Sequence, residues 1–151
     1  MDSYYNNITN YNELYGDEQR HKLHCIKKLF PTATHVLDVG CGTMLSREFF
    51  SNVTGIDPSE TLLPNDGIIG EAEVLPFEDH TFDLVICVTV LQNVTDKQQA
   101  LNEIKRVSKR NVAISIQKKS LEYEPMKQLI LETFPDMNEF DEGKDMIFYC
   151  T

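Results

Sequence analysis

The sequence is short of positive charge. It contains 14 lysine and arginine residues against 24 aspartate and glutamate residues, which gives a formal net charge of −10 at pH 7. Binding to nucleic acid or to an anionic membrane needs clustered positive charge that contacts phosphates. We therefore expect no strong nucleic-acid binding by this chain alone, and an RNA substrate would need another protein to supply the charge.

Long apolar runs and paired cysteines are also missing. No run approaches the roughly 20 apolar residues that a membrane helix requires, and no basic and apolar leader opens the sequence. The four cysteines are scattered without a C-x-x-C pair: Cys25, Cys41, Cys87 and Cys150. His21 and His24 have helical spacing, but no further ligands complete a tetrahedral site. We expect reduced thiols, no metal site, no membrane span and a cytoplasmic protein.

The composition is that of one folded domain. Apolar residues make up 41% and charged residues 25% of the 151 residues, close to the average for globular proteins. Because no linker, repeat or low-complexity tract interrupts the chain, we expect a single domain over 1–151. Four tyrosines crowd the N-terminus, and residues 1–16 are a candidate lid over a ligand site.

Apolar runs alternate with amphipathic segments. Strands are predicted at 35–39, 52–56, 67–74, 82–90, 111–116 and 146–150, and helices at 17–30, 45–50, 96–110 and 124–134. Asp17 and Asp96 are candidate N-caps, whereas Pro31 and Pro135 end helices. This alternation predicts an α/β fold with an open, mainly parallel sheet.

The loop after the first predicted strand carries the strongest chemical signal. Asp38 ends the strand, and Gly40 and Gly42 let the backbone approach a ligand closely. A dinucleotide fingerprint would need a third glycine at Leu45. Its absence disfavours phosphate binding, while Asp38 suits a ligand with a cationic amino group.

This loop resembles the first motif of class I S-adenosylmethionine-dependent methyltransferases, acid-x-Gly-Cys-Gly-Thr-Gly, except that Met44 replaces the last glycine. Residues 53–59 resemble the second motif, which implies that Asp57 accepts hydrogen bonds from both ribose hydroxyls. Residues 70–77 resemble the third block, in which Glu71 would face the adenine amino group and the Ala72 backbone the ring. Residues 82–87 resemble the fourth block, nearest the methionine moiety.

These blocks cover 36–116 and are most similar to the type 11 group, which includes ubiquinone and menaquinone biosynthesis methyltransferases. The resemblance implies a small version of a Rossmann-like, doubly wound, seven-stranded sheet with helices on both faces and an antiparallel last strand. It also implies S-adenosylmethionine as cofactor, bound by Asp38, Gly40, Cys41, Gly42, Asp57, Pro58, Glu71, Ala72, Cys87 and Val88.

The methyl acceptor is not identified by these motifs, because the scaffold is reused for many substrates. Direct in-line displacement needs mainly an aligned acceptor and the exclusion of water. Gln92, Asn93 and Tyr11 are the catalytic candidates. The two amides either orient an acceptor or satisfy loop backbone.

The crossover between Asp57 and Gly67 is too short for a full covering helix. In the usual strand order of the family the third strand lies at a sheet edge, so Ile68, Ile69 and Val74 are expected to be exposed. We hypothesise a catalytic subunit that a small protein activator completes by adding to this edge, acting on tRNA or protein. The alternatives are a non-catalytic cofactor-binding or scaffold module, because of Met44, and a small-molecule methyltransferase that acts alone.

Overall fold

The computed structural model describes the backbone of residues 8–151 and the side chains of residues 16–151. The helices are α2 (Ile8–Leu29), α3 (Lys97–Val107) and α4 (Tyr123–Thr133), with short 3-10 helices η1 (Leu45–Glu48) and η2 (Leu91–Asn93). The strands are β1 (Val36–Val39), β2 (Val53–Asp57), β3 (Ile68–Ile69), β4 (Phe82–Val88), β5 (Ser108–Gln117), β6 (Asn138–Asp141) and β7 (Asp145–Cys150).

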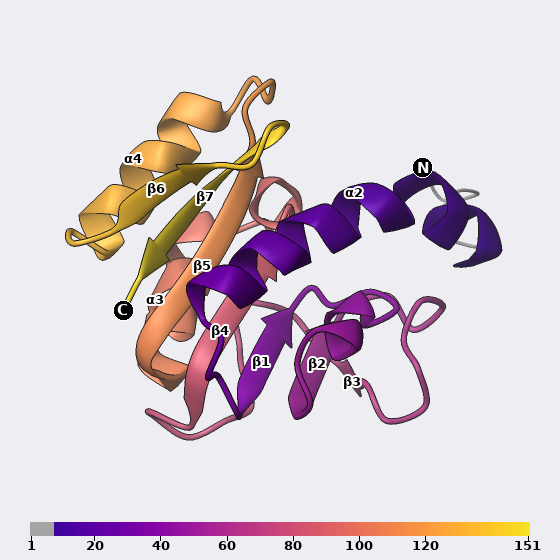
Figure 1. The fold of residues 1–151 in the computed structure, drawn as a ribbon. Coiled ribbons are helices and arrows are strands. Elements are labelled where there is room, and N and C mark those ends of the chain that lie inside the picture. The colour runs from indigo at the N-terminus through magenta and orange to yellow at the C-terminus, as the bar shows by residue number, and fades with distance from the viewer. Residues whose placement is uncertain (1–7) are drawn as a thin grey trace.

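Within residues 8–151 the strands form one seven-stranded sheet in the order β3-β2-β1-β4-β5-β7-β6 (Figure 1). The pairings among β1 to β5 are parallel, whereas β7 is antiparallel to both β5 and β6. The predicted fold class is confirmed, including the antiparallel last strand. The expected place of the third strand at a sheet edge is confirmed as well.

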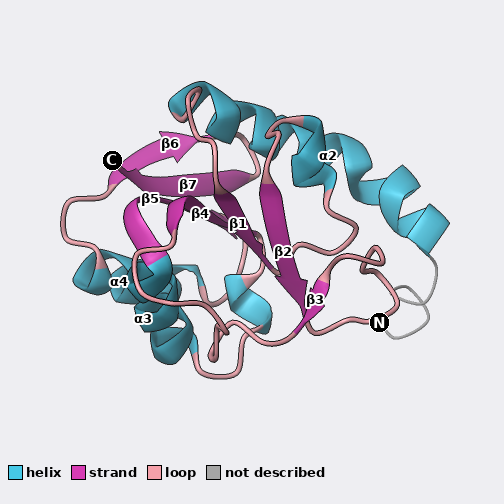
Figure 2. Cartoon of the chain, turned by 90° about the horizontal axis from the view of Figure 1, so that it is seen from below, coloured by secondary structure: helices cyan, strands magenta, loops and turns pink. Residues whose placement is uncertain are grey.

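Helices cover both faces of the sheet, with α2 on one side and α3 and α4 on the other (Figure 2). The central strand β4 shows why both faces must be covered. Leu84 and Ile86 pack with α2, while Val85 and Cys87 pack with α3, because successive side chains of a strand point to opposite faces. None of the described helices has the length and apolar character that crossing a membrane would require.

The first described helix begins earlier than predicted. We expected residues 17–30 with Asp17 as the cap, but α2 already runs from Ile8. Gly16 lies inside the helix, at a cost of about 1 kcal/mol relative to alanine, and the Arg20 guanidinium occupies the space that a Cβ at Gly16 would meet. Asp17 is therefore an interior residue of the helix and not its cap.

The boundary between α3 and β5 also differs from the prediction. The helix was expected over 96–110, but it ends at Val107 and the strand starts at once at Ser108. The basic residues Lys109 and Arg110 therefore lie on the strand and not at a helix end. The predicted cap is confirmed, because the Asp96 side chain accepts a hydrogen bond from the Gln99 amide at 3.0 Å.

The third strand is much shorter than the predicted 67–74. β3 contains only Ile68 and Ile69, and the chain turns away after Gly70. Glu103 on α3 accepts from the Leu75 amide at 2.9 Å, and the Arg106 guanidinium donates to the Leu75 carbonyl at 2.9 Å. These contacts draw the chain off the sheet edge toward α3.

The crossover that precedes β3 contains no helix, as its length predicted. The exposure expected at this edge is confirmed for Ile69, which is 60% exposed, and for Val74, which is 72% exposed. Ile68 is half-buried and packs against the α3 side of the core. The very short strand therefore exposes Ile69, while Val74 is exposed on the turn that leaves the sheet.

Candidate functional site

A cavity of about 890 Å³ opens at the carboxyl ends of β1, β2 and β4 and is closed on one side by α2. The N-terminal half of α2 passes above the strand ends to which the arrows point (Figure 1). Ligands of open α/β sheets bind at such carboxyl ends. The predicted residues that line the cavity are Asp38, Gly40, Cys41, Gly42, Asp57, Pro58, Val88, Gln92 and Asn93.

Three predicted site residues with described side chains do not line this cavity, and a fourth lies outside the described side chains. Glu71 is exposed on the turn after β3, and Ala72 is buried in the core cluster on the α3 side. Cys87 faces the same cluster and is 1% exposed. Tyr11 belongs to the first turns of α2, but its side chain lies outside the part of the chain whose side chains are described. The roles of these four residues stay predictions.

The turn after β1 depends on its glycines. Gly40 has φ 75° and Gly42 has φ 53°, in the left-handed region that other residues avoid. A Cβ on Gly40 would lie 2.5 Å from a methyl of Val90, so no side chain fits there. The Gly40 and Cys41 amides both donate to the Ile56 carbonyl, at 2.8 and 3.1 Å. The turn is thereby fixed against the end of β2.

Met44, which stands where the family motif has glycine, is accommodated beneath this turn. It adopts φ 62°, and its side chain is 3% exposed and does not line the cavity. A Cβ at Gly55 of β2 would lie 2.7 Å from Met44 Sδ, so the glycine provides the room. The left-handed conformation costs roughly 1–2 kcal/mol, but the thioether leaves the ligand space free.

Asp57 is held by backbone amides. Its Oδ2 accepts from Gly42 at 2.8 Å and its Oδ1 from Ser59 at 2.7 Å, and the residue is 8% exposed. A carboxylate has about four lone-pair sites, so about two remain for a ligand. The arrangement can accept hydrogen bonds from two adjacent hydroxyl groups.

Asp38 lies beside Asp57 and is 6% exposed. Burial raises the pKa of Asp38 to about 7, and the charge of Asp57 adds to this rise, although the Ser46 hydroxyl, which donates to Asp38 at 2.5 Å, acts against it. Among the described side chains, no lysine, arginine or histidine forms an ion pair with either carboxylate. A cationic ligand group would offset this buried negative charge.

The cysteines near the cavity are not nucleophiles. All four cysteines are free, as expected. Burial raises the pKa of Cys87 to about 12, and it raises the pKa of Cys41 as well. Since the thiolate is the reactive form, both side chains are inert thiols at neutral pH.

A second group of polar residues forms the wall between α2 and the end of β4, and we call it the Lys22 cluster: Lys22, Thr89, Ser115 and Asp145. Lys22 Nζ donates to Thr89 Oγ1 at 3.0 Å and lies 3.3 Å from Asp145 Oδ1. Thr89 Oγ1 donates to Asp145 Oδ2 at 2.6 Å, and Ser115 Oγ donates to the same oxygen at 3.0 Å. Lys22 and Thr89 line the cavity.

Sequence reasoning missed this cluster. Its members belong to four different elements, and no short motif joins them. Two signals were available in the sequence. Lys22 lies beside Leu23 and one turn before Ile26 on the buried face of α2, and Asp145 alternates with buried Ile147 on β7. A charged residue on an otherwise apolar face indicates a buried ion pair.

The predicted amides, Gln92 and Asn93, lie on η2. Gln92 Nε2 donates to the Thr89 carbonyl at 2.8 Å, which satisfies loop backbone and fixes the orientation of the amide. Gln92 Oε1 is buried and, among the described residues, has no hydrogen-bond partner. Asn93 is exposed.

Comparison with known families gives one match to more than half of the chain. The model of a methyltransferase domain, of the type 11 group, matches residues 37–116. An uncharacterised protein of Methanocaldococcus jannaschii is 38% identical over 98 residues, 57% of this chain and 42% of that protein. A demethylmenaquinone methyltransferase of Thermotoga maritima is 30% identical over 128 residues, 76% of this chain and 50% of that enzyme. The chain thus spans half or less of these relatives.

Solved structures share the fold over nearly the whole chain. An S-adenosylmethionine-dependent methyltransferase of Thermotoga maritima, described as a possible histamine N-methyltransferase, has a TM-score of 0.73 at 19% identity and covers 100% of this chain and 99% of its own. A complex of the Haloferax volcanii Trm112 methyltransferase activator with a methyltransferase gives a TM-score of 0.66 at 16% identity, over 93% and 92% of the two chains. The family and these neighbours imply S-adenosylmethionine as the cofactor, and the chain belongs to the type 11 group of class I methyltransferases.

Proposed function

We propose that this chain binds S-adenosylmethionine in the cavity and transfers its methyl group to an acceptor by direct in-line displacement. The observation that carries the proposal is the pair of buried carboxylates, Asp38 and Asp57, which no described cation neutralises. The cofactor has a cationic amino group and two adjacent ribose hydroxyls. This donor set complements the two carboxylates.

Each part of the turn has a role in this proposal. Asp57 accepts from the ribose hydroxyls with the lone pairs that Gly42 and Ser59 leave free. Asp38 faces the amino group, and Gly40 lets the backbone approach the methionine moiety. Pro58, Cys41 and Val88 contribute cavity wall. Glu71 and Ala72, which follow β3 beside the end of β2, are proposed for the adenine end.

The bound cofactor supplies an activated methyl group, so the protein aligns an acceptor and excludes water. Gln92 and Asn93, which lie just after the end of β4, are proposed to align the acceptor. Residues 1–16, including Tyr11, are proposed as the lid that excludes water. We further propose one domain over 1–151 and a cytoplasmic location, which the four free thiols favour.

A small protein activator at the β3 edge is part of the proposal, with tRNA or protein as the substrate. The two-residue β3 leaves Ile69 exposed at an open sheet edge, and Val74 is exposed on the turn that follows toward α3. Strand addition to such an edge is a common recognition mode. The Haloferax methyltransferase of the same fold is complexed with such an activator. A partner would also supply the positive charge that this acidic chain lacks.

The partner proposal is tested with Ile69→Asp and Val74→Asp in a pull-down with a Trm112-type methyltransferase activator. We expect the native chain to bind and both variants to lose binding, while their affinity for S-adenosylmethionine stays unchanged. A stable monomer that is fully active on a free small molecule would contradict the proposal and favour an enzyme that acts alone.

The scaffold alternative depended on Met44. Because the Met44 side chain packs against Gly55 and does not line the cavity, it gives no reason for a lost cofactor site. This favours the catalytic proposal.

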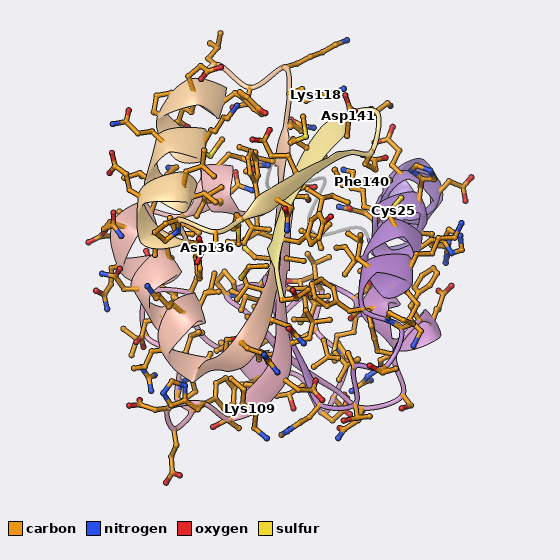
Figure 3. All side chains as sticks on the ribbon, turned by 60° about the vertical axis from the view of Figure 1, so that its left-hand side comes forward. Cys25, Lys109, Lys118, Asp136, Phe140 and Asp141 are labelled. Carbon is orange, nitrogen blue, oxygen red and sulfur yellow. The ribbon has the colours of Figure 1, made fainter. Side chains whose placement is uncertain are left out.

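Calorimetry with S-adenosylmethionine and with S-adenosylhomocysteine tests the proposal. We expect binding by the native chain and at least a hundredfold loss in Asp57→Ala. Asp136→Ala is the matched control, because Asp136 is exposed after α4 on the opposite side from α2 (Figure 3). No binding by native protein, alone or with a partner, would make the scaffold module the better interpretation.

A further inference from the structure

The negative charge of the chain is concentrated in one segment. Residues 48–96 contain ten aspartate and glutamate residues and no lysine or arginine. The rest of the chain contains fourteen acidic and fourteen basic residues, so its formal charges balance. The net charge of −10 therefore comes entirely from the segment that forms β2, β3, β4 and the loops between them.

Two of these acids lie on the connections of β3. Glu60 is in the crossover from β2 to β3, and Glu71 follows Ile69 by two residues on the turn after the strand. Both are exposed, and neither takes part in an ion pair with a described side chain. Arg47, which contacts the crossover, is already paired with Asp66. The connections of β3 thus carry negative charge without a described counter-ion.

The backbone of Ile69 faces the open side of the sheet. The Gly70 amide donates to the Asp57 carbonyl at 3.1 Å, so this amide points toward β2. Backbone groups of successive strand residues point to opposite sides, and those of Ile69 therefore point away from β2. Pro58, which follows Asp57, has no amide hydrogen that the Ile69 carbonyl could accept. Because β3 ends the strand order (Figure 1), a further strand could pair with Ile69.

The Ile69 side chain adds an apolar contact at this edge. It is 60% exposed, and it points to the face opposite Ile68, which packs on the α3 side of the core. One isoleucine and two backbone hydrogen bonds make a small contact beside the roughly 1,600 Å² that a stable protein interface buries. A partner therefore needs further contacts around β3, where the charge is negative.

This charge decides between the possible occupants of the edge. A second copy of this chain, paired at β3, would bring two acidic segments together, and like charges across an interface oppose association. The phosphates of a nucleic acid would be repelled in the same way. A protein segment with lysine or arginine residues would be attracted, because complementary charge raises the association rate and fixes the register.

We propose that the partner at the β3 edge, on whose existence in the proposed function this inference rests, adds a basic extended segment. An apolar residue of that segment packs on Ile69, and its backbone pairs with the Ile69 amide and carbonyl. Lysine or arginine residues on either side of the apolar residue contact Glu60 and Glu71. Strand addition then sets the position of the partner, and the acidic side chains select it by charge.

Three seven-residue peptides with blocked ends test this pairing. The basic peptide is Thr-Lys-Thr-Val-Thr-Lys-Thr, in which both lysines share a face with the central valine in an extended strand. The acidic peptide has glutamate in place of both lysines. The third is the basic peptide with the amides of the valine and the following threonine N-methylated, so that neither edge of the strand can pair fully. Binding to the whole chain, without cofactor, is measured by NMR at the Ile69 methyl groups.

We expect the basic peptide to bind at least about fivefold more tightly than the acidic peptide, because two exposed ion pairs are replaced by like charges. N-methylation should weaken the basic peptide by about fivefold or more, because backbone hydrogen bonds are lost. Raising the salt concentration from about 0.05 M to about 0.5 M should bring the preference for the basic peptide below about twofold, because exposed charges are screened.

Charge reversal on the chain locates the effect. The double variant Glu60→Lys and Glu71→Lys should reverse the preference, so that the acidic peptide binds more tightly. The double variant Glu124→Lys and Asp136→Lys is the matched control. It changes the net charge equally, at two exposed positions on and after α4, on the other side of the molecule from β3 (Figure 1), and it should keep the preference for the basic peptide.

Equal binding of the basic and acidic peptides would overturn the inference, and so would a preference that Glu60→Lys and Glu71→Lys leave unchanged. No peptide effect at Ile69, or no effect of N-methylation, would contradict strand addition by a basic segment. Failure of S-adenosylhomocysteine to bind, or full binding of the activator by Ile69→Asp, would instead count against the proposed function. The two failures are therefore distinguishable.

Discussion

The buried carboxylates at the two ends of the cavity differ in whether a cation lies beside them. At the end formed by β1 and β2, Asp38 and Asp57 lie close together without an ion pair to any described side chain. At the end formed by β4 and α2, Asp145 is fully buried but has Lys22 beside it and accepts two hydroxyl hydrogens. A charged ligand would satisfy the first end, whereas the carboxylate of the second already has a cation, although Asp145 Oδ1 accepts no hydrogen bond from the described residues.

This difference separates a carboxylate pair without a cation from a carboxylate that already has one. The β1 and β2 end gains stability when a cation enters, which suits a cofactor with an amino group. In the Lys22 cluster the charges of Lys22 and Asp145 offset each other, and both residues form hydrogen bonds with Thr89. The same residue type, aspartate, is therefore used for binding at one end and for positioning at the other.

The largest expected effect is the loss of stability when the ion pair between Lys22 and Asp145 is broken. Lys22→Met leaves Asp145 as a buried charge without its cation, which costs about 3–5 kcal/mol of unfolding free energy. Lys28→Met, an exposed lysine on the same helix, should change stability by less than about 0.5 kcal/mol. Denaturant unfolding measures both. Adding Asp145→Asn to Lys22→Met should recover part of the loss, and strictly additive effects would show that the two residues are not coupled.

The ligand-binding end should instead show a pH dependence. The pKa of Asp38 is raised from 3.8 to about 7, so the folded state binds more protons than the unfolded chain between these values. Stability of the ligand-free protein therefore falls as pH rises from about 4 to 7, by about 1.4 kcal/mol per pH unit from this group. In Asp38→Asn this contribution should disappear. Parallel stability profiles of the two proteins would contradict the raised pKa.

The smallest effect concerns the packing beneath the turn. Gly55→Ala places a Cβ 2.7 Å from Met44 Sδ and from Cys41 Sγ, and overpacking of this kind costs about 1–3 kcal/mol. In a Met44→Ala background the cost should fall by about 1 kcal/mol, because one of the two sulfurs is gone. A double-mutant cycle by thermal or denaturant unfolding measures this coupling. An unchanged cost would mean that Cys41 alone sets the limit.

The β1 and β2 end of the cavity was predictable because its information is local. Asp38, Gly40 and Gly42 lie within five positions of one turn, and Asp57 ends the next strand, so short patterns identify them. The buried runs of β1 and β4 were equally clear. The length of β3 could not be predicted from the sequence. Contacts with Glu103 and Arg106 on α3, and not a turn signal in the local sequence, draw the chain off the sheet.

The Lys22 cluster could not be predicted in the same way. Lys22 and Thr89 are 67 positions apart, and Thr89 and Asp145 are 56 apart. A buried ion pair of this kind forms only when α2 docks on the sheet beside β7, and sequence alone gave α2 a wrong start. The residues of α2 that line the cavity, Glu18, Gln19, Lys22 and Leu23, all lie within the predicted part of the helix.

The most direct test of the account is proton release on cofactor binding. S-adenosylhomocysteine is titrated at pH 6 by calorimetry in two buffers of different ionisation enthalpy, with Asp38→Asn beside the native chain. At this pH Asp38, with a pKa of about 7, is mostly protonated, and a bound amino group favours its ionised form. We predict release of close to one proton by the native chain and none by the variant. Binding without proton release, or equal release by both, would contradict the claim that these buried carboxylates are the cofactor site.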